Sequence, residues 1–200
     1  MRRIVAAEYV TLDGIMQDPG GNGEIERGGW SNPYWNDELA KYQSDQLFSS
    51  DALLLGRKTF TGFAAAWPKM EETEGAFAVR MNSIPKFVAS RSLNEPLEWN
   101  GTLLKGDVAE AVAKLKQEPG QDILIYGSGN LINSLLTHNV IDIYQLMVHP
   151  VVLGTGNPLF EDGAAMTALK LIDSKTTSTG VVMLTYEPAD QAHGLHSSPR

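Results

Sequence analysis

Two stretches of the sequence share one pattern and decide the fold: Ile123-Leu124-Ile125-Tyr126-Gly127-Ser128-Gly129-Asn130 and Leu53-Leu54-Leu55-Gly56-Arg57-Lys58-Thr59. Each is an apolar run followed by a glycine turn, which predicts a buried strand, a tight turn and the start of a helix. At such a junction, free backbone N–H groups and the positive end of the helix dipole face outward together and favour a phosphate. The Gly56 turn also has two cations, Arg57 and Lys58. Together, the two turns predict a phosphate-bearing dinucleotide and therefore redox chemistry.

The composition narrows the class of protein. The chain has 200 residues, of which 42% are hydrophobic and 20% charged, as expected of a single globular domain. A net charge of −8 argues against nucleic acid or an anionic membrane as a partner. The absence of cysteine excludes disulfides and thiolate chemistry. The first apolar stretch is interrupted at Glu8 and is too short for a signal peptide, so we expect a cytoplasmic protein.

The order of elements predicts an α/β fold. We expect strands over Arg3–Val10, Ala52–Leu55, Lys86–Ala89, Thr102–Leu104, Ile123–Tyr126 and Ile141–Val148. Helices are expected over about Pro33–Ser49, Lys58–Ala66, about Glu71–Met81, Asp107–Gln117 and Leu131–Thr137. Strands that alternate with helices predict a mainly parallel sheet. A terminal antiparallel hairpin over Ala168–Thr176 and Gly180–Tyr186 would extend it. Residues 1–187 would form one domain, followed by a disordered tail over 188–200.

Two common nucleotide-binding motifs do not fit. Gly127 and Gly129 match the first two glycines of a Rossmann fingerprint, but the third position is Ile132. A P-loop is also absent, because the Gly56 turn has no glycine five residues before a Gly-Lys step. Neither a Rossmann fold nor ATP hydrolysis is predicted.

Five motifs in a fixed order resemble one known family. They are Thr11-Leu12-Asp13-Gly14, Leu55-Gly56-Arg57-Lys58-Thr59-Phe60, Ser90-Arg91, Gly127-Ser128-Gly129 and the run from Pro150 to Phe160. From about Arg2 to Glu187 the chain is similar to the dihydrofolate reductase-like superfamily. The resemblance is to the branch of the C-terminal reductase domain of riboflavin-biosynthesis enzymes and its stand-alone relatives. It implies a three-layer α/β/α fold.

The resemblance also implies a bound NADPH held by the two glycine turns. Arg57 and Ser90, with Arg91 beside them, would contact the adenosine 2′-phosphate, and such residue types suit that phosphate. The cofactor-binding residues that it implies are Gly56, Arg57, Lys58, Thr59, Ser90, Arg91, Gly127, Ser128, Gly129, Asn130 and Leu131. The plain alternative is that the glycines are simple turns and Arg57 a solvated charge.

Asp13, Glu38 and Tyr126 are the candidate catalytic residues, with Asp37 as a neighbour. Asp13 could equally cap a turn, and the two acidic residues could serve only the helix dipole. In folate-reducing relatives a carboxylate on this helix binds the pterin, and the matching position here, counted back from Gly56 without a gap, is Ala40. A gap of one or two residues would bring Glu38 to that position instead. Dihydrofolate is therefore not the expected substrate.

The substrate itself is not specified by the sequence. No Lys or Arg lies between Tyr34 and Ala40, which disfavours a phosphorylated riboflavin precursor. Trp30, Trp35 and Trp67 could stack on a flat heterocycle or pack in the core. The His spacing fits no metal site. The run from Pro150 to Phe160 resembles a segment that in relatives packs near the cofactor or a dimer partner, and we expect a symmetric homodimer. The plain alternative is a rigid Pro/Gly loop between strands.

Two functions of different classes remain open. The first is an NADPH-dependent reductase of a small pterin-like, riboflavin-precursor-like or carbonyl compound. The second is a non-catalytic nucleotide-binding or sensory module on the same fold, which the missing helix carboxylate favours.

Overall fold

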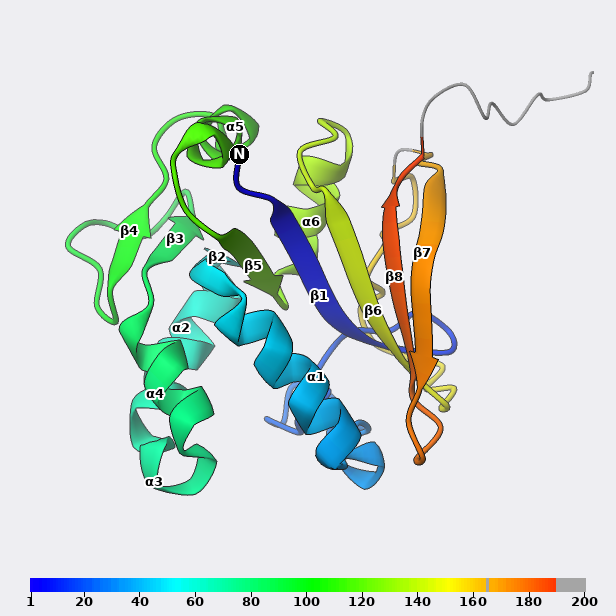
Figure 1. The fold of residues 1–200 in the computed structure, drawn as a ribbon. Helices are drawn as coiled ribbons and strands as arrows, with labels where there is room; N and C mark the ends of the chain where they lie inside the picture. Colours follow the sequence, from blue (N-terminus) through cyan, green and yellow to red (C-terminus); the bar gives the residue numbers. More distant parts are fainter. Residues whose placement is uncertain (165, 190–200) are drawn as a thin grey trace, which may run out of the picture.

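An eight-stranded sheet forms the centre of the computed structural model, which describes residues 1–164 and 166–189 (Figure 1). Its strands are β1 (Ile4–Thr11), β2 (Ser50–Gly56), β3 (Lys86–Ala89), β4 (Gly101–Leu103), β5 (Asp122–Tyr126), β6 (Ile143–His149), β7 (Leu169–Thr176) and β8 (Val182–Pro188). The spatial order is β4-β3-β2-β5-β1-β6-β8-β7. Strands β1 to β6 pair in parallel, whereas β8 is antiparallel to both β6 and β7. The predicted parallel sheet with its terminal hairpin is confirmed. The predicted tail lies almost wholly outside the described residues.

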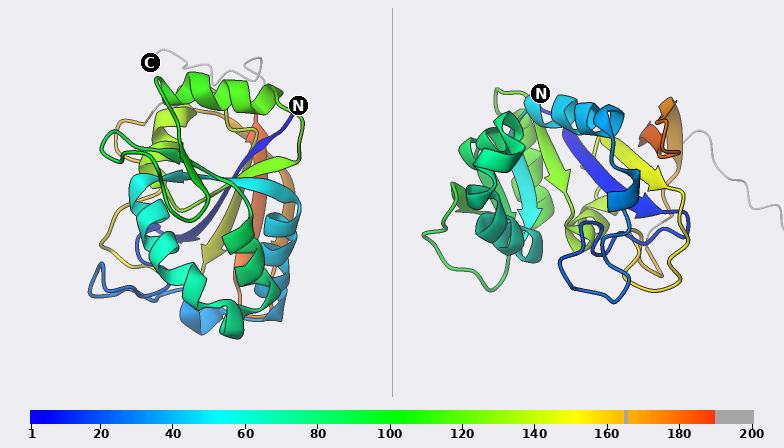
Figure 2. Two further views of the ribbon diagram at one scale, coloured as in Figure 1. Left: turned by 90° about the vertical axis from the view of Figure 1, so that its left-hand side faces the viewer. Right: turned by 90° about the horizontal axis from the view of Figure 1, so that it is seen from below.

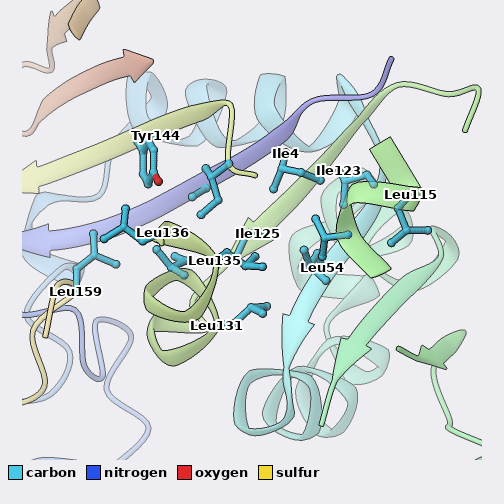
Figure 3. Packing of buried hydrophobic residues seen from close by; sticks show 14 of the residues in the cluster. Ile4, Leu54, Leu115, Ile123, Ile125, Leu131, Leu135, Leu136, Tyr144 and Leu159 are labelled. Atoms are coloured by element: carbon cyan, nitrogen blue, oxygen red, sulfur yellow. The ribbon is translucent and has the colours of Figure 1, made fainter. Parts of the chain in front are cut away.

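Helices cover both faces of the sheet, which confirms the three-layer prediction (Figure 2). They are α1 (Asp37–Phe48), α2 (Arg57–Ala66), α3 (Glu71–Glu74), α4 (Ala76–Ser83), α5 (Val108–Gln117) and α6 (Gly129–Leu136). Residues of α1, α2 and α4 share a core with one sheet face, and residues of α5 and α6 share a core with the other. Figure 3 shows the second core, in which Leu131 and Leu135 of α6 pack near Ile125. No helix of the described residues is long and apolar enough to cross a membrane.

Two helices differ clearly from the prediction, whereas α2, α5 and α6 differ from it by at most two residues at either end. The helix expected from about Pro33 begins only at Asp37, because Asn32–Tyr34 form a 3-10 turn, η1, before it. The Asn36 side chain caps α1 by accepting a hydrogen bond from Leu39 N at 2.9 Å. The helix expected over Glu71–Met81 is divided into α3 and α4 at Gly75, whose φ of 55° no ordinary helical residue adopts.

The connections between strands run toward one edge of the sheet from β1 and toward the other edge from β5, and the place where they diverge is the topological switch point. From β1 the chain passes through α1 to β2 on one side, and from β5 it passes through α6 to β6 on the other. β1 pairs with β5 only from Ile4 to Ala7, but with β6 from Val5 to Thr11. The carboxyl ends of β1 and β5 therefore separate. Ligands of open α/β sheets bind at such a switch point.

Candidate active site

Ser128 joins the two glycine turns at this switch point. Its hydroxyl accepts a hydrogen bond from Gly56 N at 2.9 Å, and its own N–H donates to Thr59 Oγ1 at 3.0 Å. The hydroxyl also lies 3.2 Å from the Tyr126 carbonyl, to which it can donate. One residue of the second turn thus fixes the first turn of α2. The two predicted phosphate-binding turns form a single unit.

The backbone of the second turn depends on glycine. Gly127 and Ser128 both have positive φ, 59° and 65°. A Cβ atom on Gly127 would lie 3.0 Å from Thr59 Oγ1, closer than ordinary contact. Glycine adopts this conformation without steric cost and leaves room for Thr59.

The helices that begin at these turns, α2 and α6, start without a side-chain cap from the described part of the chain. In contrast, Asn36 caps α1 and Asp107 caps α5. Arg57 and Lys58 occupy the first two positions of α2 and are exposed. Cations at the amino-terminal end of a helix interact unfavourably with the positive end of the helix dipole, and a bound anion would offset both positive charges.

The end of β3 brings two more of the predicted residues to the same edge. Gly56 of β2 is paired with Ala89 of β3, so Ser90 and Arg91 follow directly beside the first glycine turn. The Ser90 hydroxyl accepts hydrogen bonds from the backbone N–H groups of Ser92 and Leu93, and the Arg91 side chain is exposed. Leu131 differs from the other predicted residues because its N–H bonds to the Ser128 carbonyl at 2.8 Å and its side chain is buried in the core.

The glycine-rich loop after β1 lies against both turns. A Cβ on Gly129 would lie 2.5 Å from the sulfur of Met16, and Glu24 forms an ion pair with Lys58 at 2.7 Å. The buried Asp18 carboxylate holds the loop by accepting from Glu24 N at 2.9 Å. The space at Gly28 is filled by the same carboxylate. The loop contacts residues of the predicted cofactor site directly.

Two candidate catalytic carboxylates are bound to the protein's own backbone. Asp13 accepts hydrogen bonds from Thr11 Oγ1, Gly154 N and Leu153 N, and these lower its pKa to about 2. The N–H and hydroxyl of Ser178 donate to Glu38 at 2.6 Å each and lower its pKa. Both groups are ionised at neutral pH and hold no proton to donate.

Tyr126 remains neutral but points into the protein. Burial raises its pKa well above the usual value, and its hydroxyl donates to the Gln43 carbonyl at 3.3 Å. Its ring belongs to the core between the sheet and α1. This position is on the face opposite to α6.

An aromatic cluster surrounds His149 at the carboxyl end of β6. Its ring centroid lies 4.7 Å from that of Tyr9, 5.2 Å from that of Trp30 and 5.9 Å from that of Tyr34. Burial lowers the pKa of His149, and its Nδ1 is 2.9 Å from the Met147 carbonyl. Of the three tryptophans predicted to stack or pack, only Trp30 belongs to this cluster. Trp35 is exposed, and Trp67 packs on Phe63 and Phe77.

Glu8 is the most unusual buried residue at the switch point. It is the first residue of β1 beyond the pairing with β5, and its side chain is only 3% exposed. Its Oε1 has no hydrogen-bond partner among the described residues, while the Gly127 N–H faces the carboxyl group. Burial raises its pKa well above the usual value, with a smaller opposing effect from that N–H. The neutral, protonated form of the Glu8 carboxyl group is therefore favoured.

Sequence reasoning did not identify Glu8, Tyr9 or His149 as site residues. The available signal for Glu8 was a single charge within the apolar stretch from Ile4 to Val10. A charge in a strand with two parallel neighbours must be buried, and a buried carboxyl group indicates a special role. Tyr9 and His149 gave no comparable local signal.

This arrangement of layers and switch point is that of a dihydrofolate reductase-like α/β protein. Structures of that class overlie the chain at low sequence identity. Dihydrofolate reductase from Enterococcus faecalis, complexed with NADP(H), has a TM-score of 0.59 at 14% identity, covering 94% of this chain and 97% of that one. A Shewanella sp. PV-4 protein named for riboflavin biosynthesis has a TM-score of 0.73 at 23% identity, covering 95% and 100%.

The family model described as the RibD C-terminal domain matches residues 2–183, so the chain belongs to that family. It is also 36% identical over 187 residues to the uncharacterized protein YyaP of Bacillus subtilis (strain 168). That match covers 92% of this chain and 94% of YyaP. The predicted superfamily and branch are confirmed.

The residues at the switch point fit a dinucleotide with an additional phosphate. No described side chain caps the amino-terminal ends of α2 and α6, so their N–H groups could bind phosphates. The Glu8 Oε1, which has no partner among the described residues, is a buried polar atom that a ligand could satisfy. The exposed cations at Arg57, Lys58 and Arg91 suit the phosphates.

Proposed function

We propose that this protein is a reductase that transfers a hydride from NADPH to a small heterocyclic or carbonyl substrate. The observation that supports this most strongly is the unit formed by the two uncapped helix starts and Ser128 at the switch point. Family membership supports the same reaction class.

Each cofactor contact follows from the position of its residue along the sheet edge. Arg57, with Ser90 and Arg91 beside it, would bind the 2′-phosphate, because a planar guanidinium forms two parallel bonds to a phosphate. Thr59 and the backbone of Gly127–Asn130 would orient the pyrophosphate. The nicotinamide supplies the hydride when it is bound, and the protein aligns it with the substrate and excludes water.

The substrate side lies between α1 and the end of β1. The rings of Tyr9, Trp30 and Tyr34 meet around a His149 that burial keeps neutral, which suits a flat, uncharged compound. The segment from Tyr34 to Ala40 has no cation for a substrate phosphate. We therefore favour an unphosphorylated heterocycle over a phosphorylated riboflavin precursor.

A second function is supported by one observation. Asp13 and Glu38 are ionised and bonded to the chain, so neither donates the proton that a reduced substrate requires. A protein that binds the nucleotide without turnover would need no such donor. Steady NADPH binding without oxidation across a panel of heterocycles would favour this binding module.

The test is a calorimetric titration with NADPH and NADH of the wild type, Arg57→Ala and Lys41→Ala. Lys41 is an exposed cation on α1 that pairs with Asp45, so it controls for the change of charge. Loss of the charge-assisted hydrogen bonds of Arg57 should lower the affinity for NADPH by about 10- to 100-fold. NADH, which lacks the 2′-phosphate, should bind Arg57→Ala almost as it binds the wild type.

Three results would contradict the proposal. The first is a wild type that binds neither nucleotide, and the second is an equal weakening of NADPH and NADH binding in Arg57→Ala. The third is an equal loss of NADPH affinity in Lys41→Ala, which would show that the effect of Arg57→Ala comes only from the change in net charge.

A further inference from the structure

The predicted cofactor residues define a direction along the sheet edge. Arg91 follows β3, Arg57 follows β2 and Gly127 follows β5, in the spatial order β3-β2-β5-β1. A dinucleotide with its 2′-phosphate at β3 and its pyrophosphate between β2 and β5 extends its other end toward β1. Three strand spacings, about 14 Å, separate β3 from β1.

Glu8 is the residue of β1 toward which this other end of the dinucleotide would extend. The sheet separates immediately before it, since Ala7 is the last residue of β1 paired with β5. Its side chain alternates with that of Ala7 and so lies on the face of α6, beside the Gly127 turn. One carboxyl oxygen, Oε1, is buried and without a partner among the described residues.

We infer that the Glu8 carboxyl group binds the carboxamide of the nicotinamide ring. This inference rests on the proposed function and adds the residue that recognises the reacting end of the cofactor. A carboxylic acid has a donor and an acceptor side by side, and so has a primary amide. The two groups therefore form two parallel hydrogen bonds, one in each direction.

The environment of Glu8 supports this pairing. An unpartnered buried polar atom is costly, and a ligand that supplies the missing bond offsets that cost on binding. Burial raises the pKa of Glu8 and favours the neutral acid, which can donate as well as accept. The Gly127 N–H faces the same group, which leaves Oε1 as the spare atom.

A structural role is the competing explanation, because Glu8 could serve only to hold the Gly127 turn. Two ligands separate the alternatives. NADPH contains the nicotinamide, whereas 2′-phospho-ADP-ribose contains the same phosphates without it. A damaged turn weakens both ligands, but a lost carboxamide contact weakens only NADPH.

The experiment measures both dissociation constants by calorimetry for the wild type, Glu8→Gln and Glu8→Leu. Leucine fills the site without polar atoms, and NADPH binding should weaken about tenfold while 2′-phospho-ADP-ribose changes less than about twofold. Glutamine retains a donor and an acceptor, so Glu8→Gln should stay within about threefold of the wild type. The wild type should also bind reduced 3-acetylpyridine adenine dinucleotide phosphate more weakly than NADPH, since a methyl group replaces the amide NH2. This comparison needs no variant.

Equal weakening of both ligands in Glu8→Leu overturns the inference in favour of the structural role. Unchanged NADPH affinity in that variant, or equal binding of NADPH and its acetylpyridine analogue by the wild type, also overturns it. A wild type that binds neither NADPH nor 2′-phospho-ADP-ribose overturns the proposed function as well.

Discussion

The substitution Gly127→Ala tests the geometry that joins the two turns. Gly127 has a φ of +59°, and a Cβ there would lie 3.0 Å from Thr59 Oγ1 and 3.2 Å from Thr59 Cγ2. Thr59 is the acceptor for Ser128 N, so its displacement breaks one of the two hydrogen bonds that join the turns. The variant combines a strained backbone with a lost hydrogen bond.

The magnitude follows from these two parts. An alanine in the left-handed region costs about 1–2 kcal/mol, and a lost hydrogen bond about 0.5–1.5 kcal/mol. We expect Gly127→Ala to lower the free energy of unfolding by about 2–3 kcal/mol and the Tm by roughly 5–10 °C in a chain of this size. NADPH affinity should fall in parallel.

Two other glycines separate the contributions. Gly106 has a φ of +79° with open space around it, so Gly106→Ala should cost only the backbone part, about 1–2 kcal/mol. Gly62, within α2 and also in open space, should stabilise the protein by about 0.5–1 kcal/mol when replaced by alanine.

Urea unfolding followed by tryptophan fluorescence measures all three variants under one set of conditions. Equal stability of Gly127→Ala and Gly106→Ala, with NADPH binding intact, would refute the account of the turn.

Three further perturbations have defined outcomes. Glu24→Gln removes the ion-pair partner of Lys58. Because such an exposed pair contributes about 0.2–1 kcal/mol, NADPH affinity at low salt should rise by up to about fivefold. Weaker binding on calorimetry would show that Lys58 does not contact the phosphates. The pKa of Asp13 lies at about 2, below its usual value of 3.8, so its contribution to stability is present above pH 4 and is lost as the pH falls toward 2. The stability difference between the wild type and Asp13→Asn, from urea midpoints, should shrink over that range; a constant difference is the contrary result. Lys86 is fully buried over the Trp99 ring, and burial lowers its pKa from 10.5 to about 8. The unfolded chain then binds more protons between pH 8 and 10.5, so the stability of the wild type relative to Lys86→Met should increase as the pH rises, by at most about 3 kcal/mol. A pH-independent difference would show that Lys86 is not perturbed.

The features that the sequence predicted well are local ones. Each glycine turn lies next to its own strand and helix, so strand, turn and helix start could be recognised within eight residues. The start of α5 is also local: the helix expected over Asp107–Gln117 is present, and Asp107 caps it by accepting a hydrogen bond from Glu110 N at 3.0 Å. The start of α1 was misplaced because Pro33 allows a 3-10 turn as readily as a helical first turn.

The features that it missed depend on distant contacts. Asp13 and Glu38 had the right residue types for catalysis, but their partners Gly154 and Ser178 are about 140 residues away. No local pattern shows that these carboxylates are already bonded. Glu8 is buried in a strand that lies between β5 and β6 in the sheet, a consequence of the strand order. The predicted homodimer remains a prediction.

Amide hydrogen exchange with and without NADPH tests the central claim most directly, because it locates binding on the chain. The account predicts slower exchange in peptides that contain Gly56–Thr59 and Gly127–Leu131 when NADPH is added, with no change in the helix Val108–Gln117 on the amino-terminal side of β5. Protection confined to other segments, or none at saturating NADPH, would contradict the claim that the two glycine turns form the cofactor site.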